Sequence, residues 1–264
     1  MLLKNKNIIL TGSSGILGRK LSQKLLDEGA NIALIDINKI DLDDLKKNLK
    51  LNNNQKLAFF NIDITNEIDV INTVAEINSM YGSIDVLFNN AASKGPSLEK
   101  FLAPFEDYEV STWNSVFNVN LTGIFLLSRE VIKFMKKQKN GSIIQTASIY
   151  GVVAPKKDIY KNSSYKGNEI NTPAVYSVSK SAVIGLTKYL ASYLGPYNIR
   201  VNSISPGGIF SGQNDEFVRN YSSKVPLGRM ASAEDMFGIA VFLASEQSSY
   251  LTGQNILVDG GFSL

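Results

Sequence analysis

Residues 7–18 read NIILTGSSGILG, an apolar run followed by a turn that holds Gly12, Gly15 and Gly18. Residues 19–28 continue with apolar side chains at helical spacing, so the segment predicts a strand, a tight turn and a helix. Glycines in such a turn let the backbone approach a pyrophosphate, whose charge is received by free N–H groups at the start of the helix. The stretch therefore predicts the first unit of a dinucleotide-binding fold.

The next strand predicts which dinucleotide is bound. Residues 31–36 read NIALID and end in Asp36, at the distance from Gly12 where such a fold places the group that bonds the adenosine ribose hydroxyls. A carboxylate there repels a 2′-phosphate, and neither Ser14 nor Asn38 offers a cation to hold one. We therefore expect NAD rather than NADP. The alternative is a glycine turn without a ligand and an aspartate that caps the next helix.

Strands and helices alternate along the whole chain. Further strands are predicted at residues 57–62, 84–88, 142–147, 199–204 and 254–258, and further helices at 66–81, 113–137, 176–194 and 233–244. This order predicts one α/β domain over residues 1–264, a Rossmann fold with a doubly wound, seven-stranded parallel sheet flanked by helices. The segments 93–112, 152–174 and 208–226 show no such pattern and are expected to be substrate loops.

Polar residues follow the predicted strands at the edge of the sheet where such folds bind ligands. Asp63 either contacts the adenine or begins the next helix. Asn89 is expected to have a structural role as a clamp between neighbouring strands, whereas Asn90 and Ala91 are the better candidates for cofactor contact.

The composition excludes several classes of function. The chain has no cysteine and no histidine, so thiol nucleophiles, Ser-His triads, disulfides and the usual zinc sites are ruled out, and no metal site is predicted. The formal charge of +3 gives no support for nucleic-acid binding. No window approaches the roughly 20 apolar residues of a membrane span. The amino terminus lacks a signal-peptide pattern, so a cytoplasmic location is expected.

Tyr176 and Lys180 are four residues apart at the start of a predicted helix, so both lie on one face. A cation near a phenol stabilises the phenolate and lowers its pKa, which suits proton transfer. The alternative is an ordinary surface pair.

With these residues in place, the chain resembles the compact short-chain dehydrogenases/reductases over essentially its whole length. The features that match are the glycine turn, Asp36, Asp63, the amides after residue 88, Asn120, Ser148, Tyr176 with Lys180, Pro206-Gly207 and Asp259-Gly260-Gly261. The resemblance implies hydride transfer between a nicotinamide and an alcohol or carbonyl, and a homo-oligomer, dimer or tetramer, packed through the helices around Asn120 and Tyr176.

The resemblance also implies roles for individual residues. Tyr176 exchanges the proton with the substrate oxygen, Ser148 holds that oxygen, Lys180 bonds the nicotinamide ribose and Asn120 holds a water. The cofactor-binding residues would be Gly12, Ser14, Gly15, Leu17, Gly18, Asp36, Ile37, Asp63, Ile64, Asn90, Ala91, Ala92, Tyr176, Lys180, Pro206, Gly207, Ile209 and Ser211.

Two departures from the compact pattern bear on the substrate. Ile16 replaces the middle glycine, so the turn has the TGxxGxxG spacing of the extended members of the family. The segment between Ser148 and Tyr176 is longer than compact members usually have and is rich in Lys, Asn and Tyr, which favours a polar or anionic substrate, unless it is a surface insertion without substrate contact. Residues 148–155 together with residues 206–209 are similar to bacterial oxidoreductases of flagellin-glycan and nonulosonic-acid sugar synthesis.

The leading hypothesis is an NAD-dependent oxidoreductase of a sugar-like small molecule. A 3-oxoacyl-thioester reductase and a non-catalytic dinucleotide-binding regulator are the alternatives.

Overall fold

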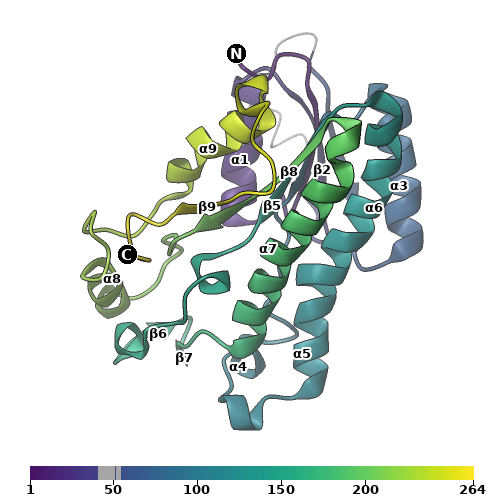
Figure 1. Cartoon of the computed structure of the whole chain (residues 1–264). Helices are drawn as coiled ribbons and strands as arrows, with labels where there is room; N and C mark the ends of the chain where they lie inside the picture. Colours follow the sequence, from purple (N-terminus) through teal and green to yellow (C-terminus); the bar gives the residue numbers. More distant parts are fainter. Residues whose placement is uncertain (41–50, 52–54) are drawn as a thin grey trace.

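The computed structural model describes residues 1–40, 51 and 55–264 of the chain (Figure 1). Its central sheet has seven strands, all parallel, in the order β3-β2-β1-β4-β5-β8-β9. Their bounds are β1 Asn7–Thr11, β2 Asn31–Asp36, β3 Leu57–Asn61, β4 Val86–Asn89, β5 Gly141–Thr146, β8 Ile199–Pro206 and β9 Asn255–Val258. The strand order reverses between β1 and β4, and an open parallel sheet binds ligands beyond the carboxyl ends of its strands at such a point. The predicted fold class is confirmed.

Helices cover both faces of this sheet. The α-helices of the described residues are α1 Ile16–Asp27, α3 Glu67–Tyr81, α4 Leu98–Phe101, α5 Val110–Phe117, α6 Ile124–Gln138, α7 Ala174–Leu194, α8 Asp215–Ser222 and α9 Phe237–Ala244. Figure 1 shows α3, α6 and α7 on one face, with α1 and α9 on the other. Among the described residues, no helix combines the length and apolar character that crossing a membrane requires.

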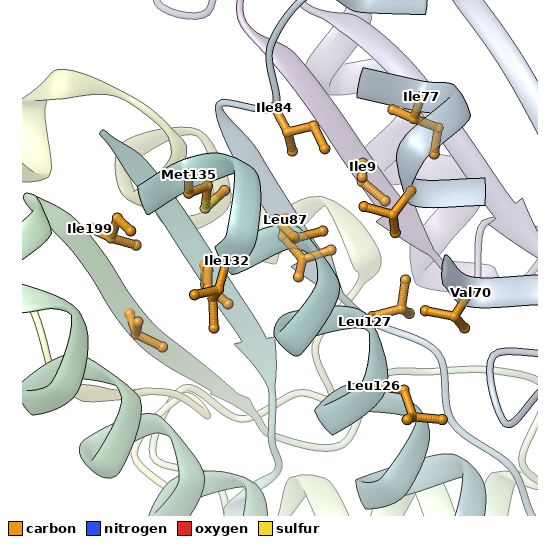
Figure 2. Packing of buried hydrophobic residues seen from close by; sticks show 14 of the residues in the cluster. Ile9, Val70, Ile77, Ile84, Leu87, Leu126, Leu127, Ile132, Met135 and Ile199 are labelled. Atoms are coloured by element: carbon orange, nitrogen blue, oxygen red, sulfur yellow. The ribbon is translucent and has the colours of Figure 1, made fainter. Parts of the chain in front are cut away.

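Because successive side chains of a strand point to opposite faces, each central strand contributes to two apolar cores. Ile9, Leu87 and Ile143 are buried against α3, α6 and α7. Figure 2 shows Ile9 and Leu87 among the side chains of α3 and α6. Their neighbours, Ile8 and Ile144 among them, are buried against α1 and α9. The strands therefore read as apolar throughout, without the alternation of a half-exposed sheet.

The long helix that the sequence predicts at residues 113–137 differs in detail. It begins earlier, at Val110, and a π-helical turn at Asn118–Gly123 separates α5 from α6. Gly123 lets this turn approach the segment after β3, since a Cβ there would lie 2.7 Å from Cγ1 of Ile64. A π-turn adds one residue to the hydrogen-bonded ring without changing the apolar pattern, so the sequence did not reveal it.

The segment 152–174 contains more structure than its lack of periodicity predicts. A short 3-10 helix at Lys157–Tyr160 is followed by a hairpin of β6 (Ser164–Tyr165) and β7 (Asn168–Glu169). Lys166 and Gly167 have φ values of 50° and 79°, so both central residues of the turn have the left-handed conformation of a type I′ hairpin. Strands of two residues are too short to produce a readable alternation.

Candidate active site

The turn between β1 and α1 is built for close approach of backbone to backbone. Gly12 has a φ of +66°, and a Cβ on it would lie 2.7 Å from Cα of Ala91. A Cβ on Gly18 would lie 2.0 Å from the Gly12 carbonyl oxygen. Helix α1 begins here without a side-chain cap and without an acidic residue in its first turn. Its amino end is therefore free to bind an anion.

Ile16, the departure from the compact glycine pattern, does not obstruct this turn. Ile16 is 53% exposed, and both Ile16 and Leu17 line the cavity that lies over the turn. The turn therefore keeps an open cavity with the TGxxGxxG spacing.

Asp36 is buried at the carboxyl end of β2, next to this turn. Its Oδ2 accepts a hydrogen bond of 2.8 Å from the Ser14 amide, and its Oδ1 accepts one of 2.9 Å from the Asn38 amide. These bonds fix the carboxylate at the edge of the cavity. No lysine or arginine lines this part of the cavity in the described chain, since Lys94 is the one cation of the lining and belongs to the segment after β4.

Asn89, the last residue of β4, and Asn90 make different hydrogen bonds from the clamp between strands that the sequence predicts for Asn89. Asn89 is fully buried, but it donates to Ser128 of α6 at 3.0 Å rather than to a neighbouring strand. The clamp between strands is Asn90, whose Nδ2 donates to the carbonyl groups of Thr11 and Gly12 at 3.1 and 3.3 Å. Asn89 continues the alternation of β4 and so faces the helices on the side of Leu87, whereas Asn90 lies beyond the strand and faces the ligand edge.

A cavity of about 530 Å³ lies over this turn and has the residue types of a dinucleotide site. Its lining contains, among others, the predicted residues Gly12, Ser14, Gly15, Leu17, Gly18, Asp36, Ile37, Asp63, Ile64, Asn90, Ala91 and Ala92. Asp63 also begins the next turn, because its Oδ1 accepts hydrogen bonds from the amide and hydroxyl of Thr65. The glycine cradle, the free helix end and Asp36 fit a pyrophosphate and an adenosine ribose.

A second cavity of about 360 Å³ adjoins the first and shares Leu17, Asn90, Ala92 and Lys94 with it. Ser148, Tyr176 and Lys180 line it together, as do Pro206, Gly207 and Ile209. Ser148 follows β5, whereas Tyr176 and Lys180 lie on the first turns of α7. Gly151 brings these elements together, since a Cβ on it would lie 2.8 Å from the Lys180 carbonyl carbon.

Lys180 is buried, with 2% of its surface exposed, and its Nζ donates a 2.7 Å hydrogen bond to the Thr146 carbonyl. Burial lowers the pKa of Lys180 to about 8, so the ammonium remains the main form at neutral pH. Its Nζ lies 5.9 Å from the centre of the Tyr176 ring. The two side chains therefore share one face of α7, as their spacing predicts.

The pKa of Tyr176 moves in the direction opposite to the sequence-based expectation. Burial raises it above the ordinary value for a phenol, and a hydrogen bond with Ser148 partly opposes this shift. Loss of water around the phenol therefore outweighs the hydrogen bond with Ser148. Tyr176 is thus a protonated phenol held beside a hydroxyl and a cation.

Two predicted residues line neither cavity. Asn120 is fully buried in the π-turn, where its Oδ1 accepts a 2.8 Å hydrogen bond from the Ser93 amide. It thereby ties the segment after β4 to the helix layer. The Ser211 amide donates to the Gln213 side chain at 2.7 Å, and it is Gln213 that lines the second cavity. Their proposed roles in catalysis and cofactor binding remain predictions.

Of the four tyrosines that line the second cavity and that the sequence did not mark as site residues, Tyr150, Tyr160 and Tyr221 form hydrogen bonds through their hydroxyl groups. The Tyr160 hydroxyl donates to the Tyr150 hydroxyl at 3.0 Å and also bonds Thr172. The Tyr221 hydroxyl accepts a 2.5 Å hydrogen bond from the Gly208 amide. The tyrosine-rich composition of residues 150–165 is a signal for the first two, but Tyr221 comes from α8, and no local pattern links it to the site.

Phe262 supports two of these tyrosines from behind the cavity lining. Phe262 is 1% exposed, and its ring stacks on Tyr221 at 4.9 Å between centroids and meets Tyr150 edge-on at 6.4 Å. Asp259 holds this end in place by accepting hydrogen bonds from the Gly261 and Ser263 amides. The substrate side of the site is therefore assembled from distant parts of the sequence.

Comparisons with known proteins agree with this geometry. Residues 12–263 match the family described as enoyl-(acyl carrier protein) reductase. The chain is 34% identical to the 3-oxoacyl-acyl-carrier-protein reductase of Thermotoga maritima, with 99% of each chain covered. It is also 34% identical, over 100% of both chains, to the post-translational flagellin modification protein A of Campylobacter coli.

A solved structure shows the same fold with a nucleotide. A short-chain dehydrogenase from Leptospira borgpetersenii serovar Hardjo-bovis with bound NAD+ superposes with a TM-score of 0.85 at 35% identity, covering 99% of this chain and 94% of that one. With the glycine cradle, Asp36 and the Ser148–Tyr176–Lys180 group in one place, the chain belongs to the short-chain dehydrogenase/reductase family of NAD(P)-dependent oxidoreductases.

Proposed function

We propose that this protein is an NAD-dependent oxidoreductase that interconverts a secondary alcohol and a ketone of a polar, sugar-like small molecule. The observation that carries the proposal is the convergence of Ser148, Tyr176 and Lys180 in a cavity that adjoins the dinucleotide cavity. NADH, when bound, supplies the hydride. In reduction, Tyr176 donates its proton to the carbonyl oxygen, Ser148 bonds the same oxygen, and Lys180 provides positive charge beside the phenol.

The choice of NAD over NADP follows from Asp36. Its carboxylate is fixed by the Ser14 and Asn38 amides and disfavours a 2′-phosphate by charge repulsion. We expect kcat/KM for NADH to exceed that for NADPH by at least about tenfold, the effect of roughly 1.4 kcal/mol of repulsion. Steady-state rates with both nucleotides at one ionic strength give this ratio, and equal values refute the assignment.

The second cavity supports a substrate with hydroxyl groups. Tyr150, Tyr160, Thr172 and Gln213 present hydroxyl and amide groups next to aromatic rings, an arrangement that suits the polar edges and apolar faces of a sugar ring. The loop 152–174 contributes tyrosine, asparagine, threonine and isoleucine to this lining, whereas its lysines lie outside. The similarity to a flagellin modification protein points to the same substrate class.

A 3-oxoacyl-thioester reductase is the second candidate. Leu98, Phe101 and Leu102 form an apolar side of the cavity that an acyl chain would fill, and a relative of 34% identity carries that name. An NAD(H)-coupled screen of sugar, sugar-phosphate and nucleotide-sugar ketones and alcohols against acetoacetyl thioesters separates the two. Preference for the thioester contradicts the sugar-like assignment.

Removal of the Tyr176 hydroxyl group tests its proposed role as proton donor. Tyr176→Phe keeps the ring that meets Phe101 edge-on but removes the proton donor. We expect turnover to fall by at least about 100-fold, the usual contribution of a general acid, with the Kd of NADH nearly unchanged. Fluorescence titration with NADH and initial rates measure the two quantities. An active Phe variant excludes Tyr176 as the proton donor.

We also propose that the chain forms a homo-oligomer through α6 and α7. Phe125 of α6 and the stacked pair Tyr189 and Tyr193 of α7 leave large aromatic surfaces exposed on neighbouring helices. Burial of such a face against a second copy, in closed symmetry, removes this area from water. Gel filtration with light scattering tests this, and a monomer at micromolar concentration refutes it.

A further inference from the structure

Two lysines lie near the ring of Tyr165, which lines the second cavity, and one of them, Lys166, is just outside the lining. Nζ of Lys94 lies 4.6 Å from the centre of the Tyr165 ring, and Nζ of Lys166 lies 5.5 Å from the same centre. Lys94 follows β4 and lines both cavities, whereas Tyr165 and Lys166 belong to the β6–β7 hairpin. The Tyr165 ring of the hairpin thus packs against the Lys94 ammonium in the wall of the second cavity.

These two ammonium groups have no anionic partner. Within residues 1–40, 51 and 55–264, neither lysine forms an ion pair, and Glu169 of the same hairpin is paired with neither. Lys224 shows the contrast, because it is paired with Asp158 at 2.6 Å just outside the cavity. A ring face attracts a cation only weakly when it is exposed.

The charge of the substrate cavity has one sign. Its lining contains Lys94 and Lys180 and, among the described residues, no aspartate and no glutamate. Lys94 and Lys166 both lie close to the Tyr165 ring, and an anion that reaches both ammonium groups is attracted by each of them. The aromatic and hydroxyl-bearing walls supply no such negative charge.

We propose that the substrate carries an anionic group, a carboxylate or a phosphate, and that Lys94 and Lys166 bind it beside Tyr165. This inference rests on the proposed function, since it assigns a substrate class to the same site. The reacting carbonyl lies at Tyr176 and Ser148, and the anionic group lies at the hairpin, where the substrate leaves the cavity. The loop between Ser148 and Tyr176 then contributes both the polar walls and half of the anion site.

The test compares charged and neutral probes of one skeleton. The probes are 4-oxocyclohexanecarboxylate against its methyl ester, and dihydroxyacetone phosphate against dihydroxyacetone. Their binding to the full-length protein saturated with NADH is measured by calorimetry. We expect at least one charged probe to bind about tenfold more tightly than its neutral partner, the size expected of one hydrogen bond to a charged group. The pair that shows the preference tells a carboxylate site from a phosphate site.

Variants assign the preference to the lysines. Lys94→Gln removes it, Lys94→Arg retains it and Lys166→Gln reduces it. Lys157→Gln is the matched control, because it removes the same charge from an exposed position of the same loop that neither lines a cavity nor lies against the Tyr165 ring. The Kd of NADH is measured for each variant. Weaker NADH binding in Lys94→Gln, with the probe preference intact, assigns Lys94 to the nucleotide phosphates and overturns the proposal.

The remaining outcomes are also decisive. Absence of any preference for a charged probe, including absence of measurable binding, overturns the anion site, as does a preference that survives in Lys94→Gln. Failure of the proposed function is separate from these results, because it appears as a lack of NADH binding by the unaltered protein before any probe is added.

Discussion

Burial of the Lys180 ammonium costs stability at neutral pH, and the cost depends on pH in a defined way. Its pKa is about 8 in the folded protein, against 10.5 for the exposed side chain. Between these values the unfolded chain binds more protons, so the free energy of unfolding rises with pH. The contribution is complete above pH 10.5 and is lost as the pH falls through 8. From pH 7 to pH 9.5 this one group adds about 2 kcal/mol.

Lys180→Met isolates this contribution because methionine has a similar length and no charge. We expect the wild type to gain about 2 kcal/mol more than the variant between pH 7 and pH 9.5. Burial raises the pKa of Tyr81 and of Tyr221 to about 12, and these groups lower stability only above pH 10, outside this window.

Urea unfolding at both pH values and one protein concentration gives the four free energies that are needed. Lys188→Met, at an exposed position of the same helix, is the control and keeps the wild-type dependence. A variant at position 180 whose stability changes with pH as much as the wild type refutes the reasoning, because the depressed pKa then contributes nothing to folding.

Two further predictions concern the β1–α1 turn and the hydrogen bond between Gly208 and Tyr221. Gly18→Ala places a Cβ 2.0 Å from the Gly12 carbonyl oxygen, so we expect a loss of about 2 kcal/mol of stability and weaker NADH binding. Gly238→Ala is the control and shows neither effect, because a Cβ there meets nothing within 4 Å. Urea unfolding and NADH titration measure both effects, and a neutral Gly18→Ala contradicts the close approach. Tyr221→Phe leaves the Gly208 amide without its acceptor, so we expect KM for the substrate to rise and stability to fall by about 1 kcal/mol. Unchanged kinetics would show that this hydrogen bond does not position residues 207–208.

Local signals predict the fold and the nucleotide side of the site well. The glycine turn, the carboxylate at the end of β2 and the Tyr176–Lys180 spacing each lie within a few residues, and helix and strand geometry alone places their side chains. The Asn89–Asn90 pair shows the limit of this reasoning. A shift of one residue in the end of β4 decides which amide faces the helices and which faces the cavity, and strand ends are the least certain part of a sequence-based prediction.

Long-range contacts account for what the sequence does not predict. Lys94, Tyr165 and Tyr221 line one cavity only because three segments distant in the sequence converge there. Tyr176 shows the same limit for electrostatics. Its pKa depends mainly on how much water the surrounding segments exclude, and the residues next to Tyr176 in the sequence do not reveal this.

The position of Phe262 has a consequence for the order in which the two sides of the site form. Its ring stacks on Tyr221 and meets Tyr150 edge-on, so these tyrosines gain that support only after residue 262 has been synthesised. The nucleotide side, from Gly12 to Ala92, is already translated when the ribosome reaches α5. A nascent chain is therefore able to form the β1–α1 turn long before the aromatic support of the substrate cavity is in place.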